Sequence, residues 1–114
     1  MNPKEQVLHY VSRAEQLLRV VYPLSKEPKV LVDVCKELSK AFPFMVRITI
    51  SLPEEQQKVI DDVEAILEKH AKSPVEFSRD KKFIICSDGY DLTQLTTEKI
   101  TRYLNTIKQF VKNE

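Results

Sequence analysis

Hydrophobic residues recur every three or four positions in two segments near the start of the sequence, which is the spacing of a buried helix face. In the first segment, between residues 4 and 22, these positions are Val7, Val11, Ala14, Leu18 and Val21. In the second segment they are Leu31, Val34, Cys35, Leu38, Ala41 and Phe42. Because proline lacks an N–H group and disfavours helix interiors, we expect Pro23 to end the first helix and Pro43 the second. Residues 1–44 are therefore predicted to form a helical hairpin.

From Met45 onward the pattern changes to an alternation of apolar and polar residues, as in a strand with one buried face. The apolar positions of this strand are Val46, Ile48, Ile50 and Leu52. Helical spacing returns in a third helix that ends before Ser73. Two short strands are predicted at 75–79 and 82–87, and a fourth helix follows from Thr96. The predicted order of elements is α-α-β-α-β-β-α.

The segment FIIC, residues 83–86, is apolar at every position, which indicates a central strand covered on both faces. The strand at 45–52, the third helix and the strand at 75–79 are expected to form a right-handed crossover, which makes these two strands parallel. The tight turn between 75–79 and 82–87 then places the last strand antiparallel to the second. The result is an α+β protein with a three-stranded sheet in the order 1-3-2. This split β-α-β arrangement is similar to a truncated ferredoxin-like fold. We expect a single domain over 1–114, with the helical hairpin at 1–44 and a β-α-β-β-α unit at 45–114.

Composition limits the classes of protein to which this sequence can belong. The 114 residues are 42% hydrophobic, which is enough for one ordinary core. A formal net charge of only +1 is typical neither of nucleic-acid-binding proteins nor of membrane-surface proteins. The sequence has no signal-peptide core and no apolar run of the roughly 18 residues that a spanning helix needs. We expect a cytoplasmic protein that does not contact membranes.

Groups that could support catalysis or bind a metal are sparse in the sequence. The two histidines and the two cysteines, Cys35 and Cys86, lack the short spacings of zinc sites. Both cysteines lie in apolar patterns, where a thiol is usually buried and the thiolate is disfavoured. We expect no cofactor, no metal and no catalytic residue, and a protein that acts by binding rather than as an enzyme.

The segment CSDGYDLTQL, residues 86–95, contains the only glycine of the sequence. Gly89 can adopt positive φ, which predicts a turn from the central strand into the last helix, with Asp91 or a threonine as the helix cap. The alternative is a metal-dependent enzyme that uses Asp88 and Asp91 as oxygen ligands. Because hard cations usually bind about six or more oxygens and the calcium-loop pattern is missing, the turn is the preferred interpretation.

Nucleic-acid binding is a second hypothesis for the function. Basic residues on the first strand and at the strand hairpin could contact phosphates along one edge of the sheet. These residues are Arg47, Arg79, Lys81 and Lys82. An RNA-recognition sheet would also present aromatic side chains, whereas Phe77 and Phe83 are predicted to lie in the core.

The leading hypothesis is a protein-interaction module, either a homodimer or an accessory subunit of a larger assembly. The apolar stripe of the first helix covers well over half of the helix circumference, and a surplus apolar face indicates a partner. The alternative is that the second helix and the sheet bury the whole stripe. The predicted interface residues are Val7, Val11, Leu18, Val21 and Tyr22.

Overall fold

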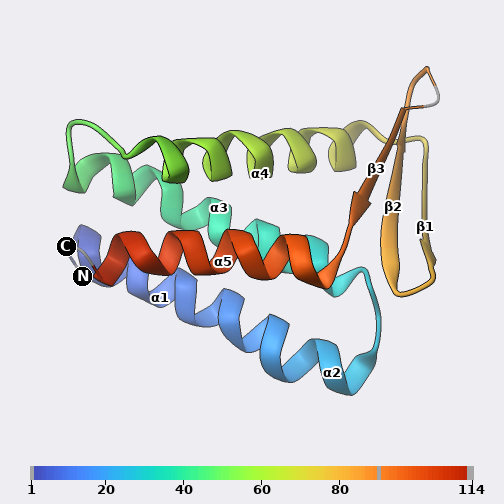
Figure 1. Ribbon diagram of the computed structural model, residues 1–114, viewed down its shortest axis with the longest axis horizontal. Coiled ribbons are helices and arrows are strands. Elements are labelled where there is room, and N and C mark those ends of the chain that lie inside the picture. Colours follow the sequence, from blue (N-terminus) through green and yellow to red (C-terminus); the bar gives the residue numbers. More distant parts are fainter. Residues whose placement is uncertain (1, 90, 113–114) are drawn as a thin grey trace.

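The computed structural model describes residues 2–89 and 91–112 of the chain. Within these residues, four long helices lie side by side and a three-stranded antiparallel sheet stands across one end of them (Figure 1). The long helices are α1 (Pro3–Gln16), α3 (Val30–Ile48), α4 (Glu54–Lys72) and α5 (Thr97–Lys112). The strands are β1 (Val75–Arg79), β2 (Lys82–Ser87) and β3 (Asp91–Leu95). The predictions of an α+β fold and an N-terminal helical hairpin are confirmed.

The first helix does not end at Pro23, contrary to the prediction. It passes from α1 into η1 (Leu17–Val21), a π-helical turn, and then into α2 (Tyr22–Ser25). The backbone N–H of Tyr22 donates to the carbonyl of Leu17, five residues earlier. Pro23 thus lies in the first turn of a new α-helical segment, where its missing N–H costs little. The helix ends after Ser25.

The predicted strand at 45–52 is wrong, because α3 continues through Pro43 as far as Ile48. The buried positions of α3 on either side of this proline are Leu38, Ala41, Phe42 and Met45. Their helical spacing is uninterrupted, so burial of this face outweighs the cost of roughly 3 kcal/mol for a proline inside a helix. The alternation that predicts a strand instead leaves Val46 and Ile50 exposed.

The sheet has the order β1-β2-β3, and both pairs of neighbouring strands are antiparallel. β2 is the central strand, as its apolar segment predicts. The predicted order 1-3-2 and the split β-α-β arrangement are wrong, because 45–52 supplies no strand to the sheet. β3 pairs with the edge of β2 that is predicted for the strand at 45–52. The polar residues of the β3 segment instead predict a turn and a helix cap. The sheet is therefore a simple meander.

The hydrophobic core lies between the helices and the inner face of the sheet, the face that is turned toward the helices (Figure 1). The sheet contributes Phe83, Ile85 and Leu95 to this core. The regular apolar spacing of the last helix is confirmed, since α5 buries Ile100, Tyr103, Leu104, Ile107 and Phe110. None of the helices in the described part of the chain combines the length and the apolar character of a membrane span.

Candidate interaction surface

The first helix places most of its predicted interface residues inside the chain. Three of them are buried in the core, with exposed fractions of 5% or less: Val7, Val11 and Leu18. A partner cannot reach these side chains in the folded protein. Val21 is 37% exposed, and Tyr22 is half-buried, with its hydroxyl donating to the Lys81 carbonyl over 3.5 Å. The hairpin as an interface stays a prediction that depends on its exposed residues alone.

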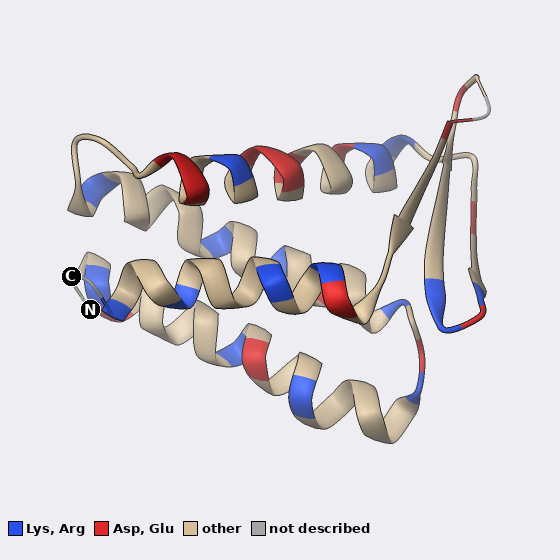
Figure 2. Cartoon of the chain, viewed as in Figure 1, with Lys and Arg blue, Asp and Glu red and all other residues tan. Residues whose placement is uncertain are grey.

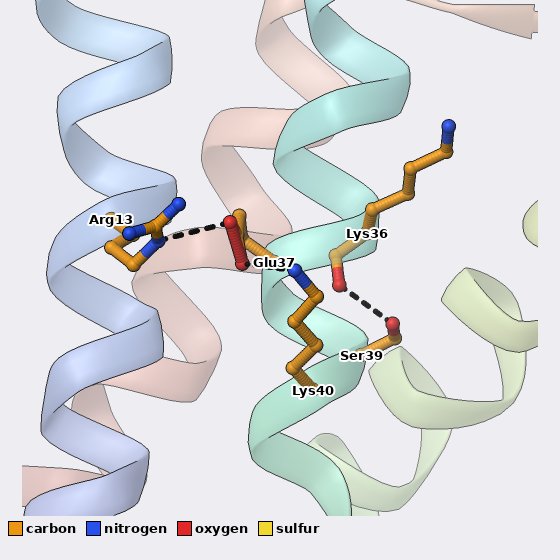
Figure 3. Close-up of polar contacts among 5 residues, drawn as sticks. All are labelled: Arg13, Lys36, Glu37, Ser39 and Lys40. Atoms are coloured by element: carbon orange, nitrogen blue, oxygen red, sulfur yellow. Dashed lines mark hydrogen bonds and ion pairs between the residues drawn. The ribbon is translucent and has the colours of Figure 1, made fainter.

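A groove of about 520 Å³ lies between the first helix and α3, and charged side chains line much of it. Glu37 is buried there, although it carries a carboxylate. Its Oε1 accepts a hydrogen bond from Arg13 Nε over 3.0 Å, and its Oε2 lies 3.3 Å from Lys40 Nζ (Figure 3). Because two cations of the same chain compensate this buried charge, the groove is explained by internal contacts between α1 and α3.

Helix α4 holds the inner face of the sheet through polar contacts. His70 Nδ1 lies 2.6 Å from Glu76 Oε2 on β1. Lys69 Nζ donates to Thr93 Oγ1 on β3 over 3.2 Å and lies 3.7 Å from Asp91 Oδ2. Both edge strands are thus attached to the same helix, which fixes the sheet with its other face directed away from the helices.

That outer face of the sheet carries an apolar cluster. Side chains alternate between the two faces of a strand, so the residues between the inward-facing ones point outward. The apolar members of the outer face are Val75 and Phe77 on β1, Ile84 on β2 and Leu92 on β3, and we call these four residues the outer sheet patch.

The outer sheet patch is open to solvent except at its centre. Val75 is 54% exposed, Phe77 41% and Leu92 54%, whereas Ile84 is only 6% exposed. Phe77 is the register partner of Ile84, so the exposed side chains surround a buried one. Cys86, half-buried, lies beside the patch as the register partner of both Val75 and Leu92. A contiguous group of exposed apolar side chains of this kind is typical of an interaction surface.

Two tight turns fix the ends of this sheet. Asp80 and Lys81 join β1 to β2 with φ angles of 52° and 65°. Positive φ at both central residues is the geometry of a type I′ hairpin turn, which matches the twist of the strands. Gly89, with φ of 86°, lies in the connection from β2 to β3. The turn at Gly89 therefore joins two strands, rather than a strand and a helix.

The two ends of the sheet carry opposite charge (Figure 2). Among the described residues, the β1–β2 end has three basic side chains against one acidic side chain: Arg79, Lys81, Lys82 and Asp80. The β2–β3 end has two acidic side chains, Asp88 and Asp91, of which Asp91 points toward the helices and lies 3.7 Å from Lys69 Nζ. All six are exposed. The outer sheet patch therefore lies between a basic end and an acidic end.

The four residues of the nucleic-acid hypothesis do not form one surface. Arg79, Lys81 and Lys82 come together at the β1–β2 turn. Arg47 lies in the last turn of α3, which ends on the opposite side of the molecule from the sheet (Figure 1). Nucleic-acid binding stays a prediction that depends on the first three residues.

Asp88 and Asp91 lie on either side of Gly89, at the connection between β2 and β3. Asp91 begins β3 as the register partner of Ser87, and Asp88 lies in the preceding turn. Over residues 2–89 and 91–112, no three His, Cys, Asp or Glu side chains are grouped so that they could hold a metal ion. The helix cap is Thr96, whose Oγ1 accepts a hydrogen bond from the Lys99 N–H over 3.1 Å.

Sequence reasoning missed the outer sheet patch, although one signal pointed to it. The apolar segment of β2 predicts a strand covered on both faces, and the helices cover only one of them. Val75 and Phe77 alternate with polar residues, which predicts one apolar face for β1. The prediction that Phe77 lies in the core is wrong, because this face of β1 points away from the helices.

No protein-family model, curated protein or solved structure matches the chain.

Proposed function

We propose that this protein is an interaction module that binds a protein partner through the outer sheet patch. The observation that supports this function is the exposure of Val75, Phe77 and Leu92 around the buried Ile84, on a sheet face that none of the described helices covers. Covering three half-exposed side chains of this kind contributes about 3 kcal/mol, from the usual free energy of apolar burial. That is enough to anchor an interface if the surrounding contacts are complementary.

The chemistry of the patch favours a protein over a nucleic acid. Three of its four side chains are aliphatic, whereas single-stranded nucleic acids bind to sheets that offer several aromatic rings for base stacking. The basic residues at one end are partly balanced by Asp80 beside them and by Asp88 at the other end. The partner that fits best is a protein with an apolar face, an acidic group near one end of that face and a basic group near the other.

Site-specific photocrosslinking in living cells tests this function. A benzoylphenylalanine introduced at Phe77 is expected to give protein adducts, because the ring would lie inside the interface. The matched control carries the same group at Gln109, which is exposed on α5. Adding Leu92→Asp to the Phe77 variant should remove the adducts. If the Phe77 and Gln109 variants crosslink equally, or if Leu92→Asp has no effect, the proposed function is wrong.

A further inference from the structure

Building on that proposed function, we propose that the partner is a second copy of this chain, bound face to face through the outer sheet patch. The chain itself has the surface that the patch requires. It presents an apolar face, a basic end at Arg79, Lys81 and Lys82, and an acidic group at the other end, Asp88. A surface with these properties is self-complementary, as the isologous interface of a two-fold dimer must be.

Charge decides between the two ways in which such sheets can pair. A two-fold axis along the strands would place the basic end of one copy on the basic end of the other. An axis across the strands reverses the strand direction and places each basic end on an acidic end. Like charges in contact disfavour the first arrangement, so the second is selected. Electrostatics of this kind sets orientation and partner choice more than affinity.

The register of the strands gives the contacts of this arrangement. Glu76, Ile85 and Thr93 form one row across the sheet, and their side chains point inward. If the two-fold axis passes over this row, each strand faces the same strand of the second copy. An outward residue on one side of the row then faces the residue of the second copy that lies equally far along that strand on the other side of the row. Phe77 then faces Val75 of the second copy.

The same axis sets the contacts along β2 and at its charged ends. Ile84 faces Cys86 of the second copy. Lys82 faces Asp88 of the second copy, so each dimer contains this pair of opposite charges twice. Both Lys82 and Asp88 are exposed in the single chain, which leaves them free to meet a partner at the rim of the interface.

A charge-exchange experiment tests this arrangement on the purified full chain. Sedimentation velocity over a concentration series should show that the wild-type protein dimerises. Lys82→Glu and Asp88→Lys, taken separately, each create two like-charge contacts per dimer and should weaken dimerisation about tenfold or more. An equimolar mixture of the two variants should recover the wild-type affinity, because a mixed dimer contains two opposite-charge contacts.

Three other results would each contradict the inference, and each has a different meaning. A wild-type chain that stays monomeric at every concentration excludes the second copy as partner. Adducts with other proteins from the Phe77 photocrosslinker would, in that case, still support the proposed function. A wild-type dimer that Leu92→Asp does not weaken uses another surface. If Leu92→Asp dissociates the dimer but the mixture of the two charge variants does not recover the wild-type affinity, the two copies have a different orientation from the proposed one.

Discussion

Arg13 and Glu37 form an ion pair that joins the two helices of the N-terminal hairpin, 24 residues apart in the sequence. Arg13 Nε donates a hydrogen bond of 3.0 Å to a carboxylate that is only 6% exposed (Figure 3). A buried carboxylate has lost most of its hydration, so its cations determine how much its burial costs. The pair therefore adds a polar contact to the apolar packing that attaches α1 to α3.

Replacing Arg13 with alanine should lower the free energy of unfolding by about 2 kcal/mol, because Lys40 alone would then compensate the buried carboxylate. Urea unfolding monitored by circular dichroism measures this loss. The double variant Arg13→Met with Glu37→Leu removes both charges and keeps apolar volume, so it should be more stable than Arg13→Ala. A double variant less stable than Arg13→Ala would show that packing of these side chains, rather than charge, dominates.

Pro43 lies inside α3, and replacing it with alanine should stabilise the protein. Alanine supplies an N–H that can donate to the Ser39 carbonyl, and it removes the clash of the proline ring with that carbonyl. Because Pro43 is exposed, no buried contact is lost. We expect a gain of about 1 kcal/mol after allowing for the greater freedom of the unfolded chain. The matched control, Pro53→Ala at the start of α4, should give no gain.

The two cysteines should differ in their reaction with a thiol reagent. Burial raises the pKa of the Cys35 thiol to about 12, whereas Cys86 is half-buried at the edge of the outer sheet patch. Because the thiolate is the reactive form, the folded chain should react through Cys86 alone at about pH 8, at a concentration low enough to keep it monomeric. Cys86→Ala should abolish this reaction, and Cys35→Ala should leave it unchanged. Rapid modification of both thiols without denaturant would contradict this prediction.

Stability should fall in alkaline solution. Burial, together with the nearby carboxylate of Asp62, raises the pKa of Tyr103 from 10.0 to about 12. Burial likewise raises the pKa of Cys35 from 9.0 to about 12. The folded chain therefore keeps these protons where the unfolded chain releases them. Since the folded state binds more protons, the free energy of unfolding should decrease as pH rises from 9.0 toward 12.

The Tyr103→Phe variant separates the two groups in this alkaline range. It removes the tyrosine proton and keeps most of the buried ring, so the decrease in stability with pH should become shallower. Urea unfolding at a series of pH values gives the slope for both proteins. Equal slopes for the wild type and the variant would show that Tyr103 does not titrate in this range.

The sequence predicts some elements of this fold well, because their local pattern and their tertiary burial agree. The spacing of Ile100, Leu104 and Ile107 predicts α5, and the apolar run from Phe83 to Cys86 predicts a central strand. In these segments every position that looks apolar is also one that the fold buries, wholly or in part.

Other elements could not be predicted because packing overrides a local signal. Pro43 predicts the end of a helix, but the buried positions on both sides of it keep α3 continuous. The strand β3 is short and largely polar, and it exists because β2 offers it an edge to pair with. The outer sheet patch depends on where the helices lie, which no single segment of the sequence specifies.

The first and last helices also determine where a group attached before Pro3 or after Lys112 would lie relative to the outer sheet patch. α1 begins and α5 ends at the end of the molecule opposite the sheet, along its longest extent of 39 Å (Figure 1). A fluorescent protein or an affinity tag attached before Pro3 or after Lys112 would therefore stand clear of the outer sheet patch. In a face-to-face dimer, cargo attached at these positions would project from two far ends, with the paired sheets acting as a spacer between them.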